Sequence, residues 1–244
     1  SAVAVAGFTG LRDYSIEADV YVYVGASASS YTGLVVYADS SKKEFYKLRA
    51  DLDASNRINL SNLKSNPSTF APYFNKDFTV AQNPGLFPTV SSWHKMKVEV
   101  RTTSADSITI WTYFDGTLIA NNPVKDTARM TSGQFGLYSF KQGATGLAAY
   151  FDNIVVKTLP GTSSAIFSED FETGTASSQW GAYYRQPGTS LAEDSLKAVP
   201  MAQAPAALAG GGNYVGWLQD LDGTYTGSAV AVAGFTGLRD YSIE

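Results

Sequence analysis

The sequence predicts an all-β protein folded as a two-sheet antiparallel sandwich, and three observations support this prediction. Apolar and polar residues alternate with the two-residue period of a strand, most clearly from Tyr14 to Val24. The chain is 44% hydrophobic and 13% aromatic but only 16% charged, a composition typical of half-buried pleated surfaces. Turn residues such as Asp115-Gly116 separate the alternating segments. Helical periodicity is nearly absent, so we expect almost no helix.

The strands can be placed in order along the chain. In residues 14–24 the even positions are mostly aliphatic and are therefore expected to face the core. Residues 95–101 and 108–114 alternate in the same way. Further strands are expected near residues 33–38, 44–52, 57–60, 133–140, 147–157, 165–172 and 214–218. Between them, four prolines predict a long irregular stretch from Asn62 to Pro88, the Ala- and Gly-rich residues 202–212 predict a loop or bulged edge, and residues 159–164 predict a linker.

The two ends of the chain carry the same segment, since Ser1–Glu17 returns letter for letter as Ser228–Glu244. We interpret the chain as a window from an array of near-identical repeats. Residues 1–160 would then hold the C-terminal two-thirds of one jelly-roll-sized unit, and residues 161–244 the N-terminal third of the same or of the next unit. In either arrangement one strand copy is left without a partner, and it would pair with another copy of the chain through covalent continuation or strand donation.

Composition excludes several classes of function. The net charge is only −4, and the Lys and Arg residues are scattered, so no basic field for nucleic acid is expected. There is no cysteine, which excludes disulfides and thiolate metal sites. No run of 18 apolar residues is present, so membrane insertion is not expected. The Ser-, Thr-, Tyr- and Gly-rich composition is compatible with an extracellular or cell-surface protein, which is the location we expect.

A series of motifs follows in a fixed order when the chain is read from residue 159 and across the repeat seam. The motifs are FSEDFE at 167–172, Trp180, DYSIEADV at 13–20, WHKMKVEV at 93–100, FDGTL at 114–118, GQFGLY at 133–138 and FDNIVV at 151–156. This series resembles the concanavalin A-like lectin/glucanase and laminin-G-like jelly rolls. The resemblance implies a jelly-roll topology over most of the unit, but it leaves function open because this fold family includes lectins, hydrolases and structural modules.

Glycoside hydrolysis is the enzymatic function to test first, because glucanases of this fold carry three carboxylates on one strand. Two of them, about 5 Å apart, serve as nucleophile and acid/base in retaining enzymes. Glu17 and Asp19 supply two carboxylates, but Tyr21 and Val22 follow where a third is needed. His94 is the only histidine and cannot build a histidine-based zinc site by itself. We therefore expect no catalysis and interpret Glu17 and Asp19 as charges on the solvent face of a half-buried strand.

Acidic residues near the opening and closing strands are the candidate metal ligands. Relatives of the resembled family hold a structural calcium ion where these strands lie side by side, and carboxylate oxygens are the ligands that calcium prefers. The resemblance therefore implies a calcium site at Asp152, Asp170 and Glu172. The alternative is that Asp152 and its neighbours only cap the junction between a loop and a strand.

Four aromatic residues are the candidate binding residues. By alternation Tyr21, Tyr23, Trp111 and Tyr113 lie on the polar face of their strands, opposite the aliphatic core positions. In lectin-like relatives such aromatic residues stack on sugar rings. Cross-strand aromatic ladders that stiffen a sheet and anchor residues between packed modules are the alternatives.

Three functions remain open at this stage. The favoured one is a non-catalytic structural module of an extracellular tandem-repeat filament or stalk, whose partners are other copies of itself, because reach and multivalency scale with copy number whereas catalysis needs one site. The second is a multivalent carbohydrate-binding adhesin. The third is a diverged glycoside hydrolase.

Overall fold

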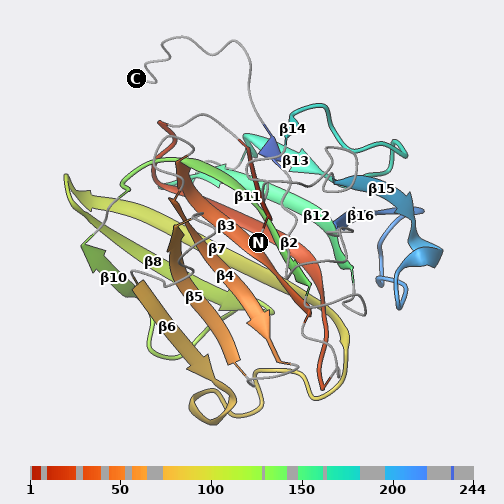
Figure 1. The fold of residues 1–244 in the computed structure, drawn as a ribbon, viewed down its shortest axis with the longest axis horizontal. Coiled ribbons are helices and arrows are strands. Elements are labelled where there is room, and N and C mark those ends of the chain that lie inside the picture. The colour runs from red at the N-terminus through yellow and green to blue at the C-terminus, as the bar shows by residue number, and fades with distance from the viewer. Residues whose placement is uncertain are drawn as a thin grey trace.

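A computed structural model describes residues 2–6, 10–25, 30–39, 44–52, 57–64, 74–127, 130–141, 148–161, 164–181, 196–218 and 232–233. It confirms the all-β prediction: two antiparallel sheets pack against each other (Figure 1), and helix in the described residues is limited to two three-residue 3-10 turns, Val80–Gln82 and Met201–Gln203. No helix in this part of the chain has the length and apolar character of a membrane-spanning segment.

The first sheet has six strands. Their order is β1 (Ala2–Ala6), β11 (Gln134–Lys141), β3 (Ser30–Asp39), β4 (Glu44–Asp51), β5 (Arg57–Lys64) and β6 (Phe74–Thr79). The second sheet has nine strands. Seven follow the order β10 (Val124–Thr127), β8 (Ser107–Phe114), β7 (Ser92–Ser104), β2 (Tyr14–Val22), β12 (Ala149–Thr158), β16 (Tyr214–Leu218) and β15 (Lys197–Pro200), while β13 (Phe167–Glu169) pairs with β12 and β9 (Thr117–Leu118) pairs with β8.

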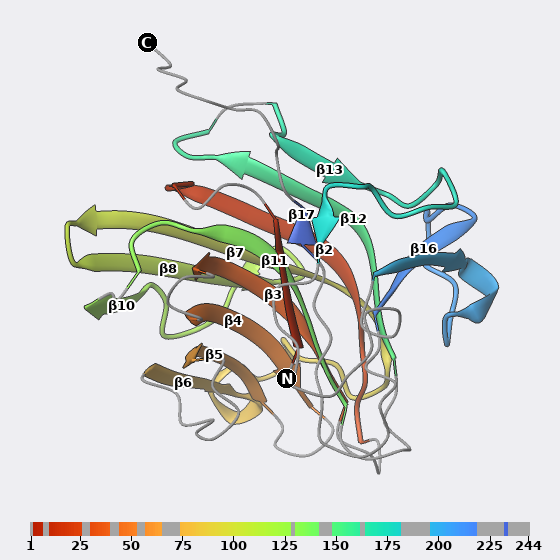
Figure 2. The same ribbon diagram turned by 45° about the horizontal axis from the view of Figure 1, so that its top comes forward.

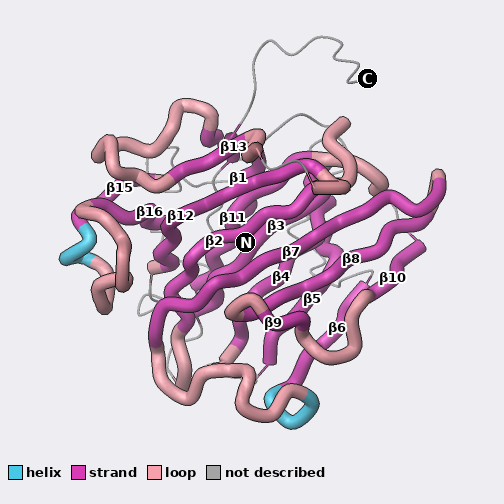
Figure 3. The backbone as a smooth tube through the Cα atoms, turned by 180° about the vertical axis from the view of Figure 1, so that it is seen from behind, coloured by secondary structure: helices cyan, strands magenta, loops and turns pink. Residues whose placement is uncertain are grey.

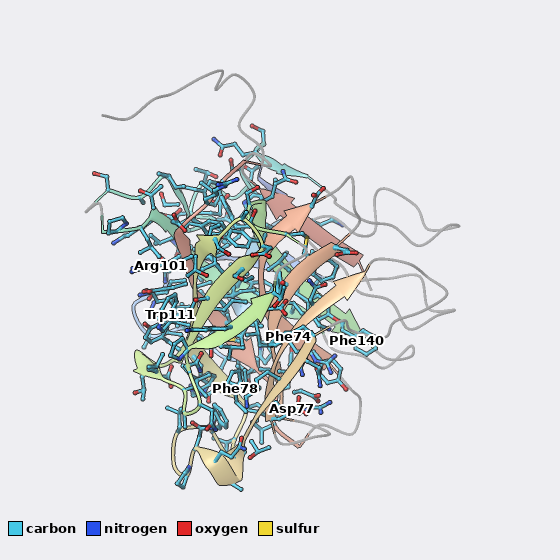
Figure 4. The ribbon with its side chains drawn as sticks, turned by 90° about the vertical axis from the view of Figure 1, so that its left-hand side faces the viewer. Phe74, Asp77, Phe78, Arg101, Trp111 and Phe140 are labelled. Atoms are coloured by element: carbon cyan, nitrogen blue, oxygen red, sulfur yellow. The ribbon has the colours of Figure 1, made fainter. Side chains whose placement is uncertain are left out.

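One hydrophobic core fills the space between the sheets. Its members alternate along each strand as predicted, so that Ile16 and Val20 of β2 and Leu34, Leu48 and Leu60 of the six-stranded sheet are all fully buried. Figure 4 views the sandwich from its side, with Phe74 and Phe78 of β6 between the sheets. The alternation leaves one outer face on each sheet, and these two faces are where functional side chains can lie.

Tyr14 connects the two sheets through the core. Its ring is fully buried, its hydroxyl donates to the carbonyl of Gln134 at 3.1 Å, and it accepts from the backbone N–H of Tyr37 at 2.8 Å. Burial raises the pKa of Tyr14 well above its usual value, so the hydroxyl stays neutral.

We expect Tyr14→Phe to lower the free energy of unfolding by about 1–3 kcal/mol, because the Tyr37 N–H would lose its buried acceptor. Urea unfolding measures this effect. Tyr113→Phe, which removes a partly exposed hydroxyl, is the control and should change stability by less than about 0.5 kcal/mol. Equal effects of the two substitutions would contradict the bridging role of Tyr14.

The segment that follows the predicted linker folds back on the same chain. Strand β12 pairs with β2 on one side and with β13 and β16 on the other, an arrangement that Figure 2 shows. Of the two arrangements that the sequence allows, the structure has the one in which residues after 160 complete the sheet formed by residues before it. Strand β1 pairs with β11, and β17 (Val232–Ala233), part of the second copy of the repeated segment, pairs with β14 (Trp180–Gly181) beside β1.

The predicted irregular stretch from Asn62 to Pro88 is wrong in part. It contains β6, a 3-10 turn and the end of β5. Of the four prolines, those at positions 67 and 72 lie outside the described residues, and Pro84 and Pro88 follow the 3-10 turn, outside the strands. Strand β6 forms because Phe78 packs fully into the core while Asn75 and Asp77 lie on the outer face of the sheet.

Candidate functional site

The outer face of the six-stranded sheet carries a set of polar side chains, several of which are buried, and we call it the polar band. The cross-strand register aligns its members in rows, with Arg49 opposite Asn59 and Asn59 opposite Asp77. The polar band consists of Lys47, Arg49 and Asp51 on β4, Arg57, Asn59 and Ser61 on β5, and Asn75 and Asp77 on β6. Exposure is only 3% for Lys47 and 1% for Asp51. Charged groups this deep on an outer face need partners.

Ion pairs hold the charged members of the polar band together. Asp51 Oδ2 accepts from Arg49 Nη2 at 3.2 Å and from Arg57 Nε at 3.0 Å. Arg57 Nη1 also donates to Asp77 Oδ2 at 2.7 Å. The amide of Asn59 donates to Asp77 Oδ1 and to Asn75 Oδ1, both at 2.7 Å. This network fixes the side chains in place before any ligand arrives, which lowers the entropy lost on binding.

Aromatic rings border the polar band on the side of β3 and β11. Tyr31 and Phe140 stack with a centroid separation of 5.1 Å and an interplanar angle of 9°. The guanidinium carbon of Arg49 lies 4.3 Å from the centroid of the Tyr31 ring. Figure 4 shows Asp77 and Phe140 on the same side of the molecule, opposite to Arg101 and Trp111 of the other sheet. Flat rings beside a fixed polar network are the usual lining of a ligand site.

Gly33 allows the strands beneath the polar band to approach closely. It lies between Tyr138 and Arg49 across the sheet. A Cβ at this position would lie 2.1 Å from the carbonyl oxygen of Leu48 and 2.8 Å from the Cα of Arg49. Only glycine therefore fits here, where β3 lies close to the backbone of Leu48 and Arg49.

Two buried atoms of the polar band have no hydrogen-bond partner among the described residues. They are Asp51 Oδ1, an acceptor, and Arg49 Nε, a donor. A buried polar atom without a partner costs about 1–3 kcal/mol, so both atoms are expected to meet water or a ligand. The side chains of Arg57 and Asp77 keep 27% and 32% of their exposure, and the band is therefore open to solvent at its β6 end.

Lys47 has an unusual environment within the polar band. Its Nζ lies 3.2 Å from the hydroxyl of Tyr138 and 4.4 Å from the centroid of the same ring. Burial lowers the pKa of the Lys47 ammonium to about 8, and the charge of Arg49 adds to this effect, whereas Tyr138 and Asp51 oppose it. At neutral pH the group remains mostly charged, and no carboxylate of the described residues forms a salt bridge with it.

The predicted aromatic residues of β2 lie on the face that alternation gives, but Tyr21 and Tyr23 are covered on that face. Both are buried, at 5% and 7% exposure, in a second hydrophobic cluster. Residues 197–218 cover them, which Figure 3 shows as β15, β16 and a 3-10 turn beside β12. The Tyr23 hydroxyl donates to the carbonyl of Ala148 at 2.8 Å. Alternation gives the face of a strand but not what packs on that face.

Trp111 and Tyr113 remain partly exposed on the outer face of the nine-stranded sheet. Arg101 lies 5.4 Å from the Trp111 ring and Lys97 lies 4.9 Å from the Tyr113 ring. Cations over rings of this kind form a cross-strand ladder. A small pocket of about 150 Å³ opens beside them, lined by Ser15, Glu17, Lys97, Val155 and Lys157. The roles of Trp111 and Tyr113 in glycan or module contact stay predictions.

The carboxylates of β2 are engaged by a neighbouring cation. Lys95 Nζ lies 2.9 Å from Asp19 Oδ1 and 3.7 Å from Glu17 Oε1. His94 lies at the start of β7, with Nδ1 2.7 Å from Asp115 Oδ2 and its ring stacked on Phe114. The interpretation of Glu17 and Asp19 as charges on the solvent face of a strand is compatible with these contacts.

The three predicted metal ligands do not gather into one ligand set. Among the described residues, no group of three or more His, Asp or Glu side chains is placed to hold a metal ion. The Glu172 carboxylate accepts from the backbone N–H groups of Asn213 and Tyr214, at 2.9 and 3.0 Å. Asp170 Oδ1 accepts from the N–H of Glu172 at 3.1 Å, and Asp152 Oδ1 accepts from that of Asn153 at 2.7 Å. These engagements favour the capping alternative, and calcium at these residues stays a prediction.

Asp152 gives the protein a pH-dependent stability. Burial raises the pKa of this carboxyl to about 6, the N–H of Asn153 opposes the rise, and the charges of Asp19, Glu172 and Asp170 add to it. A carboxyl whose pKa is higher in the folded than in the unfolded state stabilises the fold while it is protonated. That stabilisation is complete below about pH 4 and is lost as the pH rises through about 6.

We therefore expect Asp152→Asn, which fixes the neutral form, to raise the free energy of unfolding at pH 8 by about 1–2 kcal/mol. At pH 4 the same substitution should have almost no effect, because Asp152 is then already neutral. Urea unfolding at the two pH values measures the difference. An effect of the same size at both would show that the charge of Asp152 is not what destabilises the fold.

Comparison with protein-family models and with curated proteins finds no significant match for this chain. The structure therefore defines the class of the protein as a two-sheet antiparallel β-sandwich. The resemblance to the concanavalin A-like jelly rolls stays a prediction.

Proposed function

We propose that this chain is a non-catalytic, carbohydrate-binding β-sandwich module whose polar band is the binding site. The observation that carries the proposal is a pair of buried atoms, Asp51 Oδ1 and Arg49 Nε, that have no hydrogen-bond partner among the described residues and lie beside the stacked rings of Tyr31 and Phe140. A sugar hydroxyl both donates and accepts hydrogen bonds, so adjacent hydroxyls can satisfy a carboxylate oxygen and a guanidinium N–H together. The edges of these rings can pack against the C–H groups of a sugar.

The repeated segment extends this proposal to a multivalent surface protein. Ser1–Glu17 and Ser228–Glu244 are identical, and modules repeated in tandem would present the same site at regular intervals. Linked sites bind a polymer far more tightly than one site does, because each later contact is intramolecular. An extracellular array of such modules unites the structural and the adhesive functions that the sequence favours. A diverged hydrolase is less favoured because Glu17 and Asp19 are both engaged by Lys95.

Native gel electrophoresis in gels that contain dissolved neutral or acidic polysaccharides tests the proposal. The wild-type chain should be retarded by at least one polysaccharide. Tyr31→Ala and Arg49→Gln should each remove most of the retardation, whereas Trp111→Ala, on the other sheet, should keep it. If no polysaccharide retards the chain, or if Trp111→Ala abolishes retardation while Tyr31→Ala does not, the polar band is not a glycan site.

A further inference from the structure

The ligand of the polar band can be specified further by its charge. Lys47, Arg49 and Arg57 contribute three positive charges, whereas Asp51 and Asp77 contribute two negative charges. Asp51 forms salt bridges with Arg49 and Arg57, and Asp77 forms one with Arg57. One positive charge is therefore left over, in a protein whose net charge is −4.

Among the described residues, Lys47 is the cation of the polar band that forms no salt bridge with a carboxylate. Its described polar contact is the neutral hydroxyl of Tyr138, at 3.2 Å. A buried ammonium without an anionic partner is costly in the free protein, and an anion supplied by a ligand would remove this cost. Arg49, two residues along the same face of β4, has its free Nε on the same row of the sheet as Tyr138.

We infer that the polar band binds an acidic glycan, in which the carboxylate of a uronic acid residue meets Lys47 and Arg49 and a sugar hydroxyl donates to Asp51. This inference rests on the proposed function and adds the class of sugar. The ionic contact is charge-assisted and is therefore stronger than a neutral hydrogen bond. The Tyr31–Phe140 stack lies on the row next to that of Arg49, where the ring edges would pack against the C–H groups of the sugar.

The probes are oligogalacturonates and oligoguluronates, each compared with its own fully methyl-esterified form. Esterification removes the negative charge of the carboxylates and keeps the hydroxyl groups, so the two forms differ mainly in charge. Titration calorimetry of the wild-type chain at pH 7 should show at least tenfold tighter binding of an acid form than of its ester. Lys47→Met keeps the length and apolar stem of the side chain and should reduce this preference to less than threefold. Lys97→Met, on the outer face of the nine-stranded sheet, is the control for net charge and should keep it.

The outcomes separate the two proposals. Equal affinities of the wild-type chain for the acid and ester forms would overturn the acidic-glycan inference and leave the carbohydrate-binding proposal standing. Binding of neither form, together with no retardation by any polysaccharide, would overturn both. Loss of the preference in Lys97→Met but not in Lys47→Met would place the anion site on the other sheet. Should Lys47→Met fail to fold, the comparison of acid with ester on the wild-type chain decides the inference.

Discussion

Replacement of Asp51 by alanine is expected to lower the free energy of unfolding by about 3 kcal/mol. The carboxylate of Asp51 is 1% exposed and accepts from both Arg49 and Arg57. Removing it leaves two guanidinium groups close together without their shared counter-ion. The expected cost is near the lower end for a broken buried ion pair, because the side chains of Arg49 and Arg57 keep 17% and 27% exposure.

Asp77→Ala is the matched control for this prediction. Asp77 also pairs with Arg57, at 2.7 Å, but its side chain is 32% exposed. Solvent screens such a pair, so its loss should cost less than about 1 kcal/mol. Urea unfolding of the two variants measures the difference. If both substitutions cost the same, Asp51 is not the buried centre of the ion-pair network.

Phe171→Ala is expected to lower the free energy of unfolding by about 3–5 kcal/mol. Phe171 is fully buried in the core and follows β13, within the segment that folds back on the first part of the chain. Its ring lies against Gly216 of β16, where a Cβ would come within 2.4 Å of the ring. The ring therefore fixes β13 and β16 on β12, and its loss opens a cavity at this junction.

Val90→Ala provides the control, since Val90 is 68% exposed and should contribute less than about 0.5 kcal/mol. The same urea unfolding experiment also shows whether the two segments of the chain unfold together. If residues 1–161 and 164–218 form one cooperative unit, Phe171→Ala shifts a single urea transition. A new early transition, with most of the fold retained, would mean that the second segment folds separately.

The fold could be predicted largely from alternation, because each sheet buries one face. The pattern of β2, β7 and β8 gave the face of every residue correctly, and β16 was predicted with the bounds that the structure has. Short edge strands such as β6, β10 and β15 were missed. Each has only four to six residues and little alternation, and it forms because a longer neighbour supplies the hydrogen bonds.

The candidate site could not be predicted because it depends on what the sheet brings together. Lys47, Arg49 and Asp51 alternate with Leu48 and Ala50, which on a sequence resembles an ordinary solvent face. In the structure Lys47 and Asp51 are buried, and Arg49 is half-buried with its guanidinium over the Tyr31 ring. At Tyr21 the alternation predicted a position on the polar face of the strand, but residues 197–218 cover that face and bury the ring. The feature of the sequence that could have indicated the polar band is the presence of charged residues at alternate positions on two successive strands.

The central claim is that glycan binds the polar band, and side-chain NMR tests it most directly. The Nε–H signals of Arg49 and Arg101 report the outer faces of the two sheets separately. Titration of the whole chain with oligogalacturonate is predicted to shift the Arg49 signal, whose Nε has no partner among the described residues, and to leave that of Arg101, which lies over Trp111, unchanged. A shift of the Arg101 signal with no change at Arg49 would contradict the account.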